Sequence, residues 1–159
     1  MKLLIPGGAG YIGSHMVKYV QEHGHEAVVL DDFSTGHEWA VKDCEILRVN
    51  LLDREKLAKL LKGRLFDGVI HFAAKSLVGE SVKKPDLYYR NNVVGTLNLV
   101  NEMLINDFNN LVFSSTAAIF GNPVAFVAEG LKARLDLGRK SVFSKLEGII
   151  KGARKWHSR

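Results

Sequence analysis

Short apolar runs alternate with longer amphipathic stretches over residues 1–124 of the chain. Each short run is rich in β-branched residues and is apolar at consecutive positions, instead of at every second one. This pattern is typical of strands whose two faces are both covered, as in a parallel sheet. We expect five such strands, at Lys2–Pro6, Ala27–Asp31, Glu45–Val49, Gly68–Phe72 and Leu111–Ser115.

Helical periodicity fills the intervals between these strands. Helices are expected at Tyr11–His23, Arg54–Leu61 and Pro85–Asn106. The third begins at a proline, which the first turn of a helix tolerates, and its apolar residues recur at helical spacing. The alternation of strands and helices predicts an α/β fold with a doubly wound parallel sheet and right-handed crossovers.

A different pattern begins near Pro123. Residues 125–159 contain nine Lys and Arg against three Asp and Glu, whereas residues 1–124 contain 13 against 14. We expect helices in the tail at Leu131–Asp136 and Lys145–Trp156, and we interpret its charge as a solvated helix face in preference to a nucleic-acid or membrane surface. The expected organisation is one domain over residues 1–124 and a basic C-terminal helical tail over residues 125–159.

The composition is that of an ordinary globular protein, with 47% hydrophobic and 25% charged residues. No apolar run approaches the roughly 20 residues that span a bilayer, and the apolar stretch before Gly7 is too short for a signal peptide. The single cysteine, Cys44, excludes an intramolecular disulfide. His23 and His25 lack further ligands at metal-binding spacing, so no metal site is expected. We expect a cytoplasmic protein that binds neither membranes nor nucleic acids.

A glycine-rich turn, Gly7–Gly13 (Gly-Gly-Ala-Gly-Tyr-Ile-Gly), follows the first expected strand and opens the first helix. The early glycines permit a tight turn and the close approach of a pyrophosphate, and the last one lets helix and strand pack closely. Asp31 stands 18 residues after Gly13, near the spacing of an acid that binds the adenosine ribose diol. These features predict a Rossmann-like dinucleotide site, which we favour over a glycine turn without a ligand.

Asp31 and Asp32 also bear on the choice of dinucleotide. A carboxylate at this position repels the 2′-phosphate of NADP, and no Arg stands beside it. The expected cofactor is therefore NAD.

Five segments carry a more specific signal, namely Gly7–His15, Val29–His37, Ile70–Ser81, Tyr88–Leu97 and Phe113–Gly121. Together they resemble the UDP-glucose 4-epimerases, a family of extended short-chain dehydrogenases/reductases. The likeness covers residues 1–124 almost without a gap, and residues 132–157 are similar to the C-terminal end of the same family.

The resemblance implies binding of NAD and of a UDP-hexose. In this family NAD takes a hydride from C4 of the sugar, the 4-keto sugar rotates, and the hydride returns to its other face. The implied pyrophosphate contacts are Gly7, Gly10, Tyr11, Ile12 and Gly13. The implied adenosine contacts are Asp31, Asp32, Phe33, Asn50 and Leu51, with Asn50 where the family usually has Asp. The implied contacts on the nicotinamide side are Phe72, Ala73, Ala74 and Asn91.

The resemblance also implies one catalytic residue, Thr116, whose hydroxyl binds the reacting sugar oxygen. The family's general base is the Tyr of a Tyr-x-x-x-Lys pair, in which the Lys lowers the phenol pKa. None of the four Tyr residues begins such a pair, and Ser141-x-x-x-Lys145 has Ser in the Tyr position. The segment Pro85–Asn106 resembles a helix that pairs between subunits, which implies a homodimer.

The chain therefore resembles a truncated epimerase that lacks the middle of the family sequence and the UDP-sugar domain. Three hypotheses remain. The chain is an NAD-binding form with little or no epimerase activity, or an active epimerase, or a non-enzymatic NAD-binding scaffold or regulator that pairs with a full-length homologue.

Overall fold

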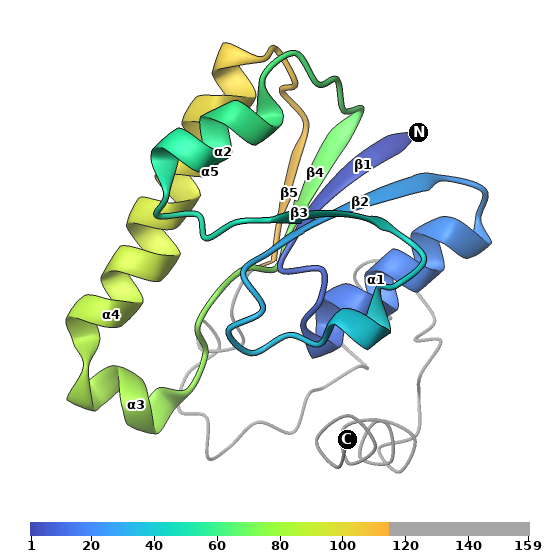
Figure 1. Cartoon of the computed structure of the whole chain (residues 1–159). Coiled ribbons are helices and arrows are strands. Elements are labelled where there is room, and N and C mark those ends of the chain that lie inside the picture. Colours follow the sequence, from blue (N-terminus) through green and yellow to red (C-terminus); the bar gives the residue numbers. More distant parts are fainter. Residues whose placement is uncertain (115–159) are drawn as a thin grey trace, which may run out of the picture. The chain divides into compact units, whose positions relative to one another are not determined.

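Five parallel strands form one sheet in the order β3-β2-β1-β4-β5 in the computed structural model, which describes residues 1–114 (Figure 1). The strands are β1 (Lys2–Pro6), β2 (Glu26–Asp31), β3 (Glu45–Arg48), β4 (Gly68–His71) and β5 (Leu111–Phe113). The chain begins at the centre of the sheet, runs outward to β3, and then crosses back over β1 to β4 and β5. This strand order is that of a Rossmann sheet, so the expected doubly wound parallel fold is confirmed.

Helices occupy the intervals between the strands, as the periodicity predicts. They are α1 (Tyr11–Glu22), η1 (Glu38–Ala40), α2 (Arg54–Leu61), α3 (Val78–Lys83), α4 (Pro85–Tyr89), η2 (Arg90–Val94) and α5 (Gly95–Ile105). The sequence pattern does not predict η1 and α3. Neither contains a buried residue, so neither needs the apolar periodicity by which a helix is recognised.

The expected long helix Pro85–Asn106 consists of three consecutive segments, α4, η2 and α5. The backbone stays helical through both junctions, with φ −61° and ψ −50° at Arg90 and φ −59° and ψ −44° at Gly95. The middle segment is a π-helix, a departure that is rare in proteins and frequent at functional sites. Apolar spacing cannot reveal it, because one wide turn barely displaces the apolar face.

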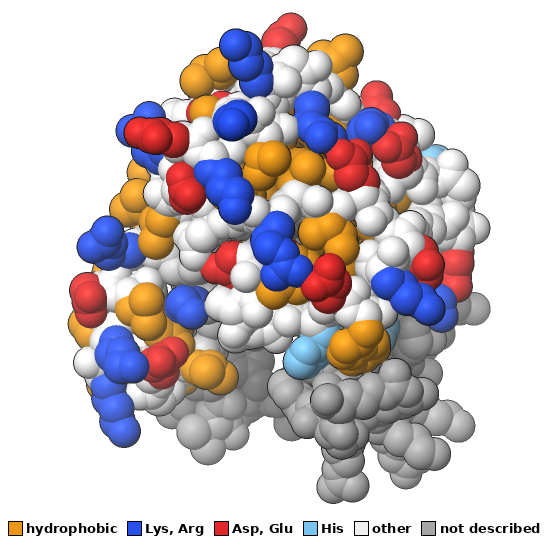
Figure 2. Space-filling view, in the orientation of Figure 1, with side chains coloured by type: hydrophobic (Ala, Val, Ile, Leu, Met, Phe, Trp, Pro, Cys, Tyr) orange, Lys and Arg blue, Asp and Glu red, His pale blue; other side chains and the backbone are white. Residues whose placement is uncertain are grey.

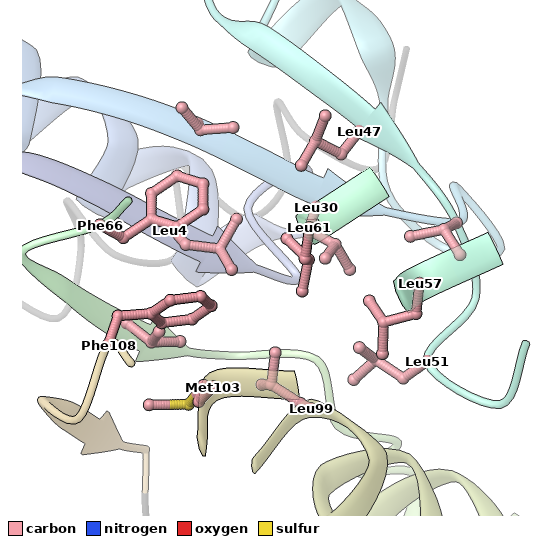
Figure 3. Packing of buried hydrophobic residues seen from close by; sticks show 13 residues of the cluster. Leu4, Leu30, Leu47, Leu51, Leu57, Leu61, Phe66, Leu99, Met103 and Phe108 are labelled. Atoms are coloured by element: carbon pink, nitrogen blue, oxygen red, sulfur yellow. The ribbon is translucent and has the colours of Figure 1, made fainter. Parts of the chain in front are cut away.

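Both faces of the sheet are covered, which explains why the strands are apolar at consecutive positions. Leu4, Val28 and Leu30 point to the face that α2 and α5 cover (Figure 3). There they meet Leu57 and Leu61 of α2 and Leu99 and Met103 of α5. The residues between them, including Ile5 and Val29, point to the other face and pack against Val17 and Val20 of α1.

The parallel strands β1, β2 and β4 end at the same edge of the sheet, at Pro6, Asp31 and His71. The connections leave β1 and β4 in opposite directions, so a topological switch point lies between these two strands. Open α/β sheets bind ligands in the crevice outside the carboxyl ends of their strands at such a point. A ligand site is therefore expected at the turns that follow β1, β2 and β4.

The surface of the described part carries charged side chains of both signs, interspersed with apolar ones on the face that Figure 2 shows. Ion pairs within residues 1–114 include Arg48–Glu38 and Arg64–Glu45, both at 2.6 Å. None of the helices formed by these residues is long and apolar enough to cross a membrane. The basic tail, its expected helices and the boundary at residue 124 lie outside the described residues.

Candidate functional site

The glycine-rich turn leaves β1 through Gly7, which has a positive φ of +77°. Its backbone N–H donates to the carbonyl oxygen of Leu30 at 2.8 Å. A Cβ at Gly7 would come within 2.5 Å of the Phe72 carbonyl carbon and would also overlap the backbone of Ala73. The turn after β1 is thereby packed directly on the turn after β4.

The last glycine of the motif, Gly13, lies in the first turn of α1 and touches the turn that precedes it. A Cβ there would overlap the carbonyl oxygen of Gly7 and lie 2.8 Å from the Cα of Gly8. Gly13 is therefore required for the close packing of helix and turn, the role that the sequence assigns to it.

Gly10 differs from the other glycines of the motif. A Cβ at Gly10 would meet only the Gly7 carbonyl oxygen, at 3.3 Å, among the described residues. Apart from this one tight contact, the described residues leave the space beside Gly10 clear. Gly10 is also the N-cap of α1, and residues 1–114 supply neither a capping side chain nor an acidic residue in the first turn. A helix terminus of this kind attracts an anion.

The carboxylate of Asp31, the last residue of β2, is 9% exposed and binds two backbone N–H groups. Its Oδ2 accepts from Ala9 at 2.9 Å, and its Oδ1 accepts from Phe33 at 2.9 Å. Burial raises the pKa of Asp31 above its ordinary value, although the two N–H groups act in the opposite direction. A carboxylate accepts about four hydrogen bonds, so acceptor capacity remains beyond the bonds from Ala9 and Phe33, which suits the hydroxyls of a diol.

Asp32 and Asn50 form a second pair beside Asp31. Asp32 Oδ1 accepts from the Ser34 N–H at 2.8 Å, and Oδ2 accepts from Asn50 Nδ2 at 2.5 Å. Burial alone would raise the pKa of Asp32, but the bonds from Ser34 and Asn50 and the charge of Lys75 outweigh it and lower the pKa. An Asp at position 50 would instead bring a like charge against Asp32.

Leu51 differs from the other implied adenosine contacts in its burial. Its side chain is 7% exposed and belongs to the hydrophobic core. Its carbonyl oxygen accepts from Asn98 Nδ2 at 2.8 Å, which ties the end of β3 to α5. The Leu51 side chain therefore packs in the core at this edge of the sheet. That Leu51 contacts a cofactor stays a prediction.

The turn after β4 is fixed to β1 by a hydrogen bond from the Phe72 N–H to the Pro6 carbonyl oxygen, at 2.7 Å. His71, at the end of β4, is 2% exposed. Its Nδ1 accepts from the Ala73 N–H at 3.1 Å, so the ring proton lies on Nε2. Nε2 is 3.0 Å from the Thr96 hydroxyl, which itself donates to the Asn92 carbonyl oxygen at 2.7 Å. Burial lowers the pKa of His71 to about 4, in agreement with a neutral ring.

Asn92, in the π-helical segment, holds the same turn from the other side. Its Oδ1 accepts from the Lys75 N–H at 2.8 Å, and its Nδ2 donates to the Lys75 carbonyl oxygen at 2.9 Å. Asn91 Nδ2 donates to Asn92 Oδ1 at 2.9 Å. Asn91, an implied contact on the nicotinamide side, is thus linked to the turn through Asn92. The Asn92 side chain therefore binds both the N–H and the carbonyl oxygen of Lys75, as the backbone of a neighbouring strand would.

The structure thus brings the turns after β1, β2 and β4 together at one edge of the sheet, with Asn91 close behind. Thr116 lies outside the described residues. One expectation is wrong: an Arg does stand beside Asp31, because β3 pairs in register with β2 and places Arg48 next to it. Sequence reasoning also passed over Asn92 and Thr96, although two adjacent Asn residues inside a helix are themselves a signal, since Asn is a poor helix former.

Comparison with known proteins agrees with this geometry. The model of the NAD dependent epimerase/dehydratase family matches residues 3–136. A UDP-glucose 4-epimerase of Halalkalibacterium halodurans is 48% identical over 124 residues, which cover 78% of this chain and 37% of that protein. The UDP-glucose 4-epimerase of Corynebacterium glutamicum is also 48% identical over 124 residues, covering 77% and 37%. The chain therefore spans less than two fifths of the length of these relatives.

Solved structures give the same result. The UDP-glucose 4-epimerase of Brucella ovis in complex with NAD has a TM-score of 0.72 at 42% identity, over 77% of this chain and 38% of that one. The Thermus thermophilus enzyme in complex with NAD has a TM-score of 0.68 at 38% identity, over 73% and 38%. From the family match, the relatives and the fold together, this chain belongs to the NAD dependent epimerase/dehydratase family.

Proposed function

We propose that this chain binds NAD across the switch point of its sheet and has little or no UDP-glucose 4-epimerase activity by itself. The observation that carries the proposal is the bond between Asp31 Oδ2 and the Ala9 N–H. It joins the acid at the end of β2 to the glycine-rich turn, so that a diol site and an anion site are built as one unit.

The residues present fit the parts of NAD. The open space beside Gly10 and the N-terminus of α1 suit the pyrophosphate. The remaining acceptor positions of Asp31 suit the adenosine ribose, with Asp32, Phe33 and Asn50 beside it. Phe72, Ala73 and Ala74 lead away from the same turn and would flank the nicotinamide ribose. The bound cofactor would supply hydride acceptance, while these residues bind and orient it.

The Gly10→Ala variant tests NAD binding, because among the described residues a Cβ at Gly10 meets fewer and more distant atoms than a Cβ at Gly7, Gly8 or Gly13. The extended backbone of Gly10 (φ −72°, ψ 171°) accommodates alanine and its Cβ meets one described atom at 3.3 Å, so the melting temperature should fall far less than in Gly7→Ala or Gly13→Ala. A methyl group in the pyrophosphate position should weaken NAD binding by about tenfold or more in calorimetry.

Gly79→Ala is the matched control, since a Cβ at Gly79 meets no described atom within 4 Å. It should bind NAD as the unmodified chain does. If Gly10→Ala binds NAD with unchanged affinity, or if the unmodified chain does not bind NAD at all, the proposed function is wrong.

The low epimerase activity follows from the sequence, which has no Tyr-x-x-x-Lys pair. The proposed role of Thr116 is to hydrogen-bond the sugar oxygen, but its hydroxyl is not acidic enough to serve as a base at neutral pH. General base catalysis contributes about 10²–10⁴-fold, and positioning of the sugar contributes more. A coupled assay for UDP-glucose formed from UDP-galactose should detect no turnover. Activity that Thr116→Val abolishes would contradict this part of the proposal.

We further propose a homodimer through residues 85–106, in the cytoplasm. The segment exposes a row of large apolar side chains, with Tyr89 at 70%, Leu97 at 56% and Leu104 at 65% exposure. Helices that expose such residues associate through them. Light scattering should give the mass of a dimer, and Leu97→Glu should reduce it to that of a monomer that keeps its helical circular dichroism spectrum.

A further inference from the structure

We infer that Glu38 is a specificity-determining residue, which favours NAD over NADP by holding Arg48 in an ion pair. This inference rests on the proposed binding of NAD at Asp31. It assigns a function to the short segment η1, which the sequence pattern does not predict and the proposed function leaves unused.

Arg48 lies beside the proposed adenosine ribose site. It is the last residue of β3 and pairs in register with Asp31, so the two side chains leave neighbouring strands on the same face of the sheet. The Arg48 guanidinium carbon lies 4.2 Å from the centre of the Phe33 ring. The Phe33 N–H in turn donates to Asp31 Oδ1. Asp31 and Arg48 therefore flank the same residue.

Arg48 is already engaged by Glu38, whose Oε2 lies 2.6 Å from an Arg48 terminal nitrogen. Both side chains are about half exposed, at 53% and 63%, so either can be reached from solvent. The Arg48 guanidinium thus lies beside the proposed ribose site, but the Glu38 carboxylate already binds it.

Glu38 is held in place by the fixed backbone on either side of it. The His37 N–H donates to the Ala9 carbonyl oxygen at 3.0 Å, which attaches the segment to the glycine-rich turn. On the other side, the Val41 N–H donates to the Glu38 carbonyl oxygen at 3.1 Å, and Val41 is only 2% exposed. Gly36 packs on Ala9 so closely that a Cβ would come within 2.8 Å.

NAD and NADP differ only in the 2′-phosphate on the adenosine ribose. Arg is the residue best suited to bind a phosphate, because its planar guanidinium donates two parallel hydrogen bonds. A free Arg48 would provide such a site. Glu38 opposes such a site by occupying the Arg48 guanidinium.

The test compares the dissociation constants of NAD and NADP for the full chain and for Glu38→Gln by calorimetry. Loss of Glu38 should lower the ratio of the NADP constant to the NAD constant by about fivefold or more, with NAD binding nearly unchanged. An exposed ion pair contributes little to stability, so the variant should fold normally. The double variant Glu38→Gln/Arg48→Gln should lose this gain in NADP binding, because the effect passes through Arg48.

Glu45→Gln is the matched control, since Glu45 and Arg64 form an ion pair of the same length, 2.6 Å, at the opposite end of β3. It should leave the ratio unchanged. If Glu38→Gln binds NAD but keeps the ratio of the unmodified chain, or if the double variant keeps the gain, the inference is wrong while the proposed function stands. If the unmodified chain binds neither dinucleotide, both fail.

Discussion

Asp31 and Ala9 are 22 residues apart in the chain, yet the Asp31 carboxylate and the Ala9 N–H meet at 2.9 Å. The bond closes the glycine-rich turn onto the end of β2. Asp31 therefore has a structural task in addition to its proposed contact with a ribose, and the two tasks use different acceptor positions of one carboxylate.

The Asp31→Asn variant should lose both NAD binding and stability. Both oxygens of Asp31 accept from backbone N–H groups, so the NH₂ group of Asn would face one of these donors. We expect a loss of about 1–3 kcal/mol in the free energy of unfolding, measured with urea, and weaker binding of NAD in calorimetry. Asp32→Asn also loses one accepted bond, from the Ser34 N–H or from Asn50 Nδ2, but both bonds are exposed, so water can replace the lost partner and the stability should change less. Equal losses in the two variants would contradict this view of Asp31.

Much of this fold follows from local pattern. Both faces of the sheet are covered, so strands such as Lys2–Pro6 are apolar at consecutive positions, here from Leu3 to Pro6, and are easily recognised. The glycine-rich turn is equally easy to recognise in the sequence, because the positive φ at position 7 and the close packing at position 13 both require glycine. Arg48 was missed for a different reason: its proximity to Asp31 depends on the register between β2 and β3, which no local sequence pattern reports.

The same reason applies to Asn92. Its two bonds to Lys75 join residues that are 17 positions apart, across the turn after β4 and two short helices. In sequence it is a polar residue in a helical stretch, and nothing shows that the helix widens into a π segment there. Contacts that depend on how separate elements meet are thus the part of the site that sequence cannot supply.

A core substitution on α5 should cost far more than the same change at an exposed site. Leu99 is fully buried and packs with Leu57 and Met103, whereas Leu65, outside the proposed dimer contact, is 76% exposed. Leu99→Ala should lower the free energy of unfolding by about 2–5 kcal/mol. Leu65→Ala makes the same chemical change and should have an effect within about 0.5 kcal/mol of zero. Similar losses in urea unfolding of the two variants would show that α5 does not pack as described.

Asn92→Asp should loosen the turn after β4. Aspartate still accepts from the Lys75 N–H, but it cannot donate to the Lys75 carbonyl oxygen. Loss of one such bond should cost about 1 kcal/mol and speed amide hydrogen exchange at Lys75 and Ala73. Asn109→Asp, at an exposed position whose side chain bonds Asp107 and no other residue in the described part of the chain, serves as the control and should leave exchange in that turn unchanged. Unchanged exchange in Asn92→Asp would show that other contacts fix the turn.

His71 should make the fold sensitive to acid. Its pKa is about 4 in the folded protein against an ordinary 6.5, so the folded state binds the proton more weakly than the unfolded state. Its contribution to stability is therefore complete above pH 6.5 and is lost as the pH falls towards 4. The loss should reach about 2 kcal/mol at pH 5 and about 3 kcal/mol near pH 4. Asp31, whose pKa is raised, acts in the opposite sense on acidification.

His71→Asn isolates this contribution, because the amide oxygen can accept from the Ala73 N–H but the side chain does not titrate. The variant should be less stable than the unmodified chain at pH 7.5, and the difference should shrink as the pH falls to 5, in urea unfolding at each pH. His23→Asn, at the exposed C-cap of α1, should retain the pH dependence of the unmodified chain. A difference between His71→Asn and the unmodified chain that stays constant from pH 7.5 to 5 would mean that His71 is not held neutral by burial.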